Sequence, residues 1–160
     1  MKKILAMLLA LVMVLSLAAC ASTQPAAEPA ASSDAPAESG KTYTVGVCQL
    51  VQHEALDAAT QGFVDALKDE LGDAVTIDVQ NASGDSVNCG TIVNGFVAKG
   101  VDLIMANATP ALTAAVSATA DIPILGTSIT AYGVALDIDD FSGTVGGNVS
   151  GCLLYTSPSP

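Results

Sequence analysis

Cationic and aromatic side chains are scarce in this sequence. Its 160 residues include five cationic side chains, all of them lysine, against 16 acidic ones, which gives a net charge of −11 at pH 7. Because phosphate binding needs clustered Lys and Arg, this composition argues against a nucleic-acid partner. Tryptophan is absent, and aromatic residues make up 4% of the chain. A hydrophobic core must therefore be built from Val, Ile, Leu and Ala.

The residues of familiar catalytic and metal sites are also missing. Nucleophilic catalysis requires a nucleophile, a base and a group that orients the base, but His53 is the one conventional base and no G-x-S-x-G motif is present. The cysteines lack the C-x-x-C spacing of zinc sites. We therefore expect no enzyme activity, no metal site and no cofactor. A Rossmann-like enzyme is the weaker alternative, because the stretch 49–53 lacks the glycine-rich first loop that such enzymes need.

The N-terminus has the features of an export signal. Two lysines precede an apolar run over residues 4–17, and Leu-Ala-Ala-Cys follows at 17–20. A positive start, a short apolar run and small residues predict a secretory signal peptide over residues 1–19. The run is shorter than the roughly 20 residues of a membrane span. The tetrapeptide resembles a bacterial lipobox, which implies cleavage before Cys20 and a lipid on its sulfur.

A tether is expected between this lipid and the folded domain. Residues 20–40 are rich in Ala, Ser, Pro, Glu and Asp and contain no large apolar side chain. Such a segment cannot bury enough surface to offset its chain entropy, so we predict a disordered tether. The whole N-terminal region predicts an exported protein that is lipid-anchored on the outer side of the cell membrane, or periplasmic.

Strand and helix patterns alternate from Tyr43 onwards. Short β-branched runs predict strands, and apolar residues at intervals of three and four predict helices. Four strands joined by three helices indicate an α/β fold with a doubly wound parallel sheet over residues 42–130. The expected strands begin at Tyr43 and cover 75–79, 101–106 and 122–125, and the expected helices cover 54–71, 87–98 and 111–120.

Three cysteines follow Cys20 in the chain. Cys48 lies in a predicted buried strand, where cysteine commonly acts as a small apolar residue, and Cys89 lies in a predicted helix. In an exported protein these two can also form a disulfide. The sequence does not decide between two free thiols and a disulfide for this pair.

The opening of the domain carries a family resemblance. The motif V-G-V-C-Q-L-V-Q-H-E-A-L-D, after a lipoprotein start and a tether, resembles the substrate-binding proteins of bacterial ABC importers, in the branch associated with aromatic amino acids such as tryptophan and tyrosine. The similarity continues in order through residues 80–85, 102–106, 108–111, 121–124 and 146–151. It implies a type I periplasmic-binding-protein fold, in which two lobes close on a small solute and the closed form docks on a permease.

This chain departs from the family pattern in two respects. The resemblance implies two α/β lobes, whereas the sequence contains the pattern of one Rossmann-like lobe and the second lobe is missing. We expect the N-terminal ligand-binding lobe at 42–130 and a crossing segment towards the second lobe at 131–151. Residues 152–160 do not continue the pattern, so we predict a non-native tail, with a natural disordered C-terminus as the alternative.

Ligands of doubly wound sheets bind in the crevice outside the carboxyl ends of the strands. Free amides at the helix start near Thr109 would favour a carboxylate, and several of the candidates have a structural alternative as a helix cap, a turn or a linker residue. The predicted ligand-binding residues are Gln49, His53, Asn81, Thr109, Thr127, Ser128 and Thr130.

The predicted function is the capture of a small polar solute for an ABC permease. An amino acid such as tryptophan or tyrosine is the solute that the resemblance suggests. The alternative is a surface lipoprotein that senses a small ligand without transport, which the sequence does not separate from the importer component.

Overall fold

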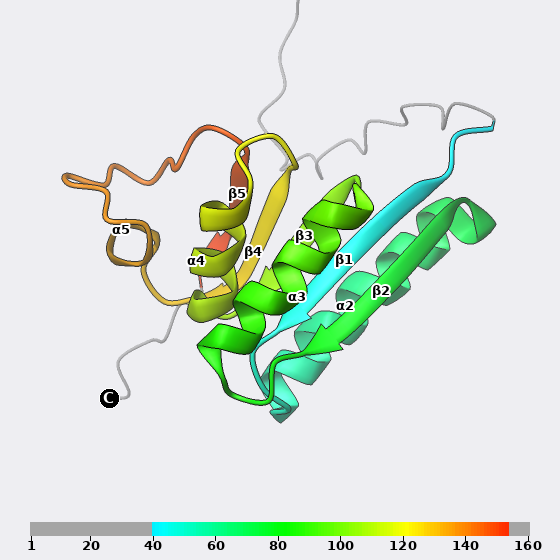
Figure 1. The fold of residues 1–160 in the computed structure, drawn as a ribbon, viewed down its shortest axis with the longest axis horizontal. Helices are drawn as coiled ribbons and strands as arrows, with labels where there is room; N and C mark the ends of the chain where they lie inside the picture. Colours follow the sequence, from blue (N-terminus) through cyan, green and yellow to red (C-terminus); the bar gives the residue numbers. More distant parts are fainter. Residues whose placement is uncertain (1–39, 154–160) are drawn as a thin grey trace, which may run out of the picture. The chain divides into compact units, whose positions relative to one another are not determined.

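Strands and helices alternate along residues 40–153, the part of the chain that the computed structural model describes (Figure 1). The predicted signal peptide, the lipid on Cys20 and nearly all of the predicted tether lie outside these residues, as do residues 154–160. The elements are β1 (Tyr43–Gln49), α2 (Glu54–Leu71), the 3-10 turn η1 (Gly72–Ala74), β2 (Val75–Asn81), α3 (Ser86–Lys99), β3 (Leu103–Asn107), α4 (Thr109–Ala118), β4 (Ile124–Ile129), α5 (Tyr132–Ala135) and β5 (Val149–Leu153).

The strands form one parallel sheet in the order β2-β1-β3-β4-β5. Helices α3 and α4 cover one face and α2 lies against the other (Figure 1). The predicted doubly wound parallel α/β fold is confirmed. In the register of the sheet, Gln49 at the end of β1 pairs with Asn81 on β2 and with Asn107 on β3. The carboxyl ends of these strands therefore meet at a single edge.

Local sequence signals set the helix boundaries. Helix α2 has the predicted bounds, with the His53 side chain accepting a hydrogen bond from the Ala55 amide at its start. Asp85 caps α3 by accepting from the Val87 amide at 2.8 Å, and α3 ends at Gly100 with φ at +65°. Both signals are short-range, since a capping side chain and a left-handed glycine act within one turn of the helix.

The C-terminal part of the sheet differs from expectation. The fourth strand begins at Ile124, after Pro123, and continues to Ile129 rather than ending at 125. A fifth strand, β5, pairs with β4 in a region that the sequence predicts to be a crossing segment. Residues 146–151 contain few β-formers, and β5 depends on its neighbours instead: the Ile124 amide donates to the Asn148 carbonyl at 2.8 Å.

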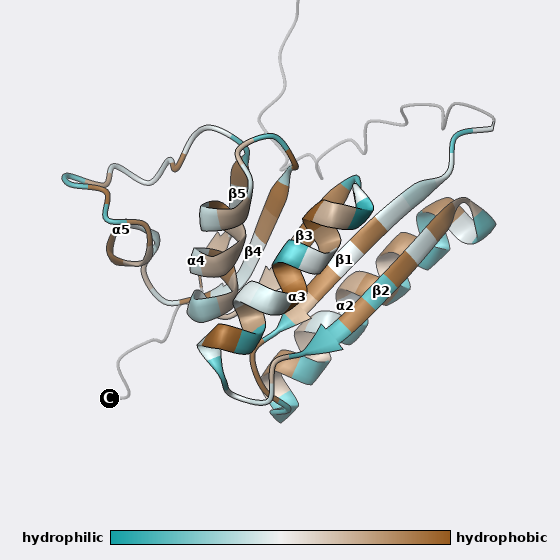
Figure 2. Cartoon of the chain, in the orientation of Figure 1, coloured by the Kyte–Doolittle hydropathy of each residue, from teal (hydrophilic) through white to brown (hydrophobic). Residues whose placement is uncertain are grey.

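The larger hydrophobic core lies between the sheet and helices α3 and α4. Figure 2 shows apolar colour along the central strands and polar colour at the end of β2. Cys48 and Cys89 are both fully buried in this core as free thiols, so the structure contains no disulfide between them. Burial, together with the neighbouring Cys89 thiol, raises the pKa of Cys48 to about 12. The pair acts as two small apolar residues.

Gly46 and Gly62 provide a matched test of this packing. A Cβ on Gly46 would lie 2.6 Å from the Phe96 ring, whereas a Cβ on Gly62, on the exposed side of α2, would meet nothing within 4 Å. We expect Gly46→Ala to lower the free energy of unfolding by about 1–3 kcal/mol through overpacking. Gly62→Ala should raise it by about 0.5–1 kcal/mol, because Ala favours the helix. Urea unfolding measures both, and an unchanged stability for Gly46→Ala would contradict the packing described.

Candidate functional site

The backbone is strained at the carboxyl edge of the sheet. Three non-glycine residues have positive φ angles in or next to the loops at this edge: Ser83 after β2 at +56°, Ala108 after β3 at +91°, and Ser128 near the end of β4 at +57°. Such conformations cost of order 1–3 kcal/mol each and persist where the surroundings enforce them. Strain gathered at one edge marks that edge as a candidate site.

A buried polar network holds α2 against the strand ends at this edge. The Thr60 hydroxyl donates to the Gln49 side-chain carbonyl at 2.6 Å and accepts from the Asn107 side-chain amide at 2.9 Å. Asn107 also donates to the Leu56 carbonyl at 2.8 Å. Thr60, Gln49 and Asn107 are 8%, 4% and 0% exposed. The network therefore fixes the first turns of α2 to β1 and β3 in a water-poor environment.

Gln49 also orders the loop that follows it. Its side-chain amide donates to the Val51 carbonyl at 2.9 Å and to the Asp57 carboxylate at 2.5 Å. With the carbonyl occupied by Thr60, the polar atoms of Gln49 all have partners within the protein. Its role at the site is to position the first loop and Asp57.

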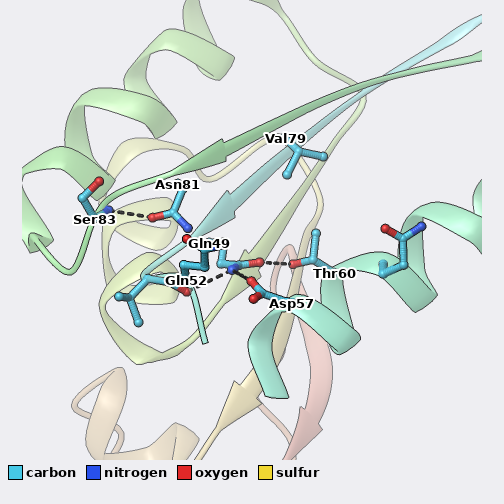
Figure 3. A pocket seen from close by; sticks show the side chains of 9 residues that line it. Gln49, Gln52, Asp57, Thr60, Val79, Asn81 and Ser83 are labelled. Carbon is cyan, nitrogen blue, oxygen red and sulfur yellow. Dashed lines mark hydrogen bonds between the residues drawn. The ribbon is translucent and has the colours of Figure 1, made fainter. Parts of the chain in front are cut away.

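A pocket of about 710 Å³ opens beside this network, between α2 and the end of β2 (Figure 3). Its volume lies within the range of small-molecule sites, about 300–1,000 Å³. Asp57 is the one charged side chain in its lining, which consists of Gln49, Val51, Gln52, Asp57, Thr60, Gln61, Val79, Asn81 and Ser83. The pocket therefore offers one carboxylate, several amides and hydroxyls, and two apolar side chains.

The start of α4 is a second feature of the same edge. Ala108 precedes the helix with no side-chain cap, and Pro110 lies in the first turn. The Ala108 amide donates to the Thr127 carbonyl at 3.0 Å, which brings the end of β4 next to the helix start. Amides in the first turn of a ten-residue helix without a capping side chain favour a negatively charged group.

The structure separates the predicted site residues into groups. Gln49 and Asn81 line the same pocket (Figure 3), and Asn81 also makes a turn by accepting from the Ser83 amide at 2.8 Å. Thr109 and Thr127 lie around the start of α4. The remaining three are Ser128 in β4, Thr130 just after it and His53 as the exposed cap of α2. These three, like Thr109 and Thr127, do not line the pocket.

Three residues of the network were not among the predictions. Asp57 and Thr60 lie three residues apart and therefore share a helix face, and that face is the one that packs on the sheet. A polar pair at this spacing on an apolar face was the available signal. Asn107 ends an otherwise apolar strand, and a buried polar residue there requires hydrogen-bond partners that the sequence does not identify.

Comparisons with known proteins agree with this architecture. Residues 44–153 match the family model described as ABC transporter substrate binding protein. This chain belongs to that family. The resemblance deduced from the opening motif is thus confirmed for this substrate binding protein, and the loops at the carboxyl edge are the place to seek its ligand.

Three relatives define the similarity further. The chain is 38% identical, over 98% of its length, to a protein named tyrosine-binding protein from Clostridioides difficile. Its fold matches an open, ligand-free substrate binding protein with adhesive properties from Clostridium difficile, at a TM-score of 0.66 and 39% identity over 72% of this chain. It also matches an ABC domain from Streptococcus pneumonia in complex with L-Trp, at a TM-score of 0.63 and 37% identity over 69% of this chain.

The chain spans less than half of each of these relatives. It covers 46% of the tyrosine-binding protein, 40% of the open structure and 38% of the L-Trp complex. Within residues 40–153, no group of three or more His, Cys, Asp or Glu side chains is placed to hold a metal ion. No helix in that range is long and apolar enough to cross a membrane.

The polar network predicts that valine substitutions at two helical threonines, Thr60 and Thr113, differ widely in their effect on the free energy of unfolding. Thr60→Val keeps the shape of the side chain but leaves the Gln49 side-chain carbonyl and one N–H of the Asn107 amide without a partner, so the free energy of unfolding should fall by about 2–3 kcal/mol. Thr113→Val is the control, because the exposed Thr113 hydroxyl bonds the Thr109 carbonyl of its own helix and the Ala135 carbonyl of α5 at the surface, and its loss should cost within about 0.5 kcal/mol. Equal losses in urea unfolding would show that the network does not stabilise the fold.

Proposed function

We propose that this chain is the N-terminal lobe of an extracytoplasmic solute-binding protein that captures an amino acid and delivers it to an ABC permease. The observation that carries the proposal is the convergence, at one edge of the sheet, of strained loops, a polar pocket and the uncapped start of α4. The names of two relatives, which refer to tyrosine and to L-Trp, support an aromatic amino acid as the solute. The proposed role is non-catalytic.

The ligand carboxylate is assigned to the start of α4. There the first-turn amides and the Thr109 hydroxyl act as donors, and Ser128 and Thr130 at the end of β4 supply further hydroxyls. Thr127 holds the helix start in place, because its carbonyl accepts from the Ala108 amide. Asn81 contributes an amide from the end of β2. His53, exposed at the start of α2, covers the ligand from the first loop, and Gln49 positions that loop.

Capture of the solute requires a second lobe that contacts it. The part of each relative that this chain matches is 38–46% of that relative's length, and we propose that a second lobe closes on the ligand from the opposite side. Closure is a hinge motion, and the ligand favours the closed state because it makes contacts with both lobes there. The closed form is the one that docks on the permease.

The binding test uses the full-length protein and isothermal calorimetry with L-tyrosine and L-tryptophan. We expect saturable binding of at least one of them, and we expect Thr109→Val to weaken it about fivefold, because one hydrogen bond to the carboxylate is lost. Thr113→Val, one turn further along α4, should leave the affinity unchanged. Absence of heat with either amino acid at millimolar concentration would contradict the proposed function, and equal effects of both valine variants would contradict the role of Thr109.

We further propose that a lipid on Cys20 anchors the protein to the outer side of the membrane. In cells fed an alkyne-tagged fatty acid, the wild-type protein should take up the label and sediment with the membrane fraction. Cys20→Ser should lose both properties, whereas Cys152→Ser should keep them. Label retained by Cys20→Ser would place the lipid on another residue, and absence of label from the wild type would exclude a lipid anchor.

A further inference from the structure

A mostly apolar groove of about 270 Å³ lies between α2 and β5, on the α2 face of the sheet. Its lining includes Ala59 and Phe63 of α2, Met105 of β3, Leu125 of β4 and Cys152 of β5. Met105 and Leu125 are neighbours in the register of the sheet, but Met105 is 2% exposed, whereas Leu125 and Phe63 are partly exposed. Both faces of a parallel sheet are normally covered, and this part of the α2 face is not.

The handedness of the connections explains why no helix within residues 40–153 fills the groove. The step from β1 to β2 crosses the sheet in one direction, and the steps from β2 to β3, β4 and β5 cross it in the other. Right-handed connections place the helices of these later steps on the opposite face from α2. Helices α3 and α4 lie there (Figure 1), and Tyr132 of α5 is buried in the same core. A segment that fills the groove must therefore come from outside this run of strands.

The rest of this sequence is a poor source of that segment. Residues 21–39 contain no large apolar side chain, and residues 1–19 carry the predicted signal peptide. Residues 154–160 are too few for a packed helix and include Pro158 and Pro160, which a helix interior does not tolerate. By contrast, the matched part is 38–46% of each relative, so more than half of each relative lies outside the match.

The dimensions of the uncovered face fit one helix. Neighbouring strands lie about 4.8 Å apart, so β4 and β5 together span about 10 Å. A helix with its side chains is about 10–12 Å in diameter. An apolar stripe with residues at intervals of three and four would contact Phe63 on one side and Leu125 below it.

We propose that one amphipathic helix, from the part of the full-length protein that follows residue 160, packs in this groove beside α2. This inference rests on the proposed function, because it takes the chain as the N-terminal lobe of a longer protein. It adds that the polypeptide returns to this lobe after leaving it, and it gives the surface on which the returning helix lies.

The test places a photoreactive aromatic side chain in the groove of the full-length protein. Phe63→p-benzoylphenylalanine is the test variant. Asp65→p-benzoylphenylalanine is the matched control, because Asp65 is exposed and lies on the opposite side of the same helix. After irradiation of a dilute sample, we expect the Phe63 variant to remain a monomer that carries an internal cross-link to a residue beyond 160, identified by peptide mass spectrometry. The Asp65 variant should lack this cross-link.

A smaller substitution replaces the Phe63 variant if thermal unfolding shows that the bulky side chain prevents folding. Ala59→Cys places a thiol in the groove, and Ala58→Cys places one at the neighbouring exposed position. Because thiol labelling depends on access, iodoacetamide should label Ala59→Cys about tenfold more slowly than Ala58→Cys in the full-length protein. Equal labelling rates would show that the groove is open and would overturn the proposal.

The cross-linking outcomes separate this proposal from its alternatives. A folded Phe63 variant without an internal cross-link beyond residue 160 overturns it, and a cross-link between two molecules assigns the groove to a second copy instead. Calorimetry with L-tyrosine and L-tryptophan on the same protein tests the proposed function independently. A protein that binds either amino acid but has an open groove keeps the function and loses the helix. A protein with a covered groove that binds neither keeps the helix and loses the function.

Discussion

The contact between Thr60 and the two carboxamides of Gln49 and Asn107 determines how this domain is organised. The sheet brings the ends of β1 and β3 together, but backbone pairing leaves the position of α2 along the sheet undetermined. Hydrogen bonds from one helical hydroxyl to both strand ends fix that position. Because all three groups are buried, a misplaced helix would leave them without partners, at a cost of about 1–3 kcal/mol for each group. The network thus specifies one arrangement as well as stabilising it.

This constraint also orders the candidate site. Gln49 connects the interior of the domain to its surface, since the same side chain that accepts from Thr60 donates to the carboxylate of Asp57. The first loop and the first turn of α2 are therefore held by groups beneath them. On the other side of β1, the start of α4 is placed by strained backbone and by the pairing of Ala108 with Thr127. Hydrogen bonds of this kind preorganise the candidate site, and preorganisation reduces the entropy that a protein loses on binding a ligand.

Elements defined by local interactions are predictable from the sequence, and those defined by distant partners are not. The bounds of α2, the Asp85 cap and the left-handed Gly100 follow from patterns within a few residues. The resemblance to substrate-binding proteins follows from the opening motif and is supported by the family match. Strand β5 escaped prediction because Asn148 and β4, not its own residues, make it a strand. At the site, sequence identified Gln49 and Asn81 as edge residues but missed Thr60 and Asn107, whose roles arise from contacts between separate elements.

The register shift in β4, at Ser128, limits the insertions and deletions that this strand can tolerate. Thr127 faces the α2 side of the sheet, where it lies near Ala59 and Phe63, and strict alternation would place Ile129 on that side as well. Ile129 is instead fully buried in the core beneath α3 and α4, because the register with β5 shifts between Gly126 and Ile129 and Ser128 adopts a left-handed conformation. Removing one residue from this stretch would move each later side chain of β4 to the opposite face of the sheet. The stretch from Gly126 to Ile129 within β4 is thus a point at which single-residue deletions should be absent from functional relatives.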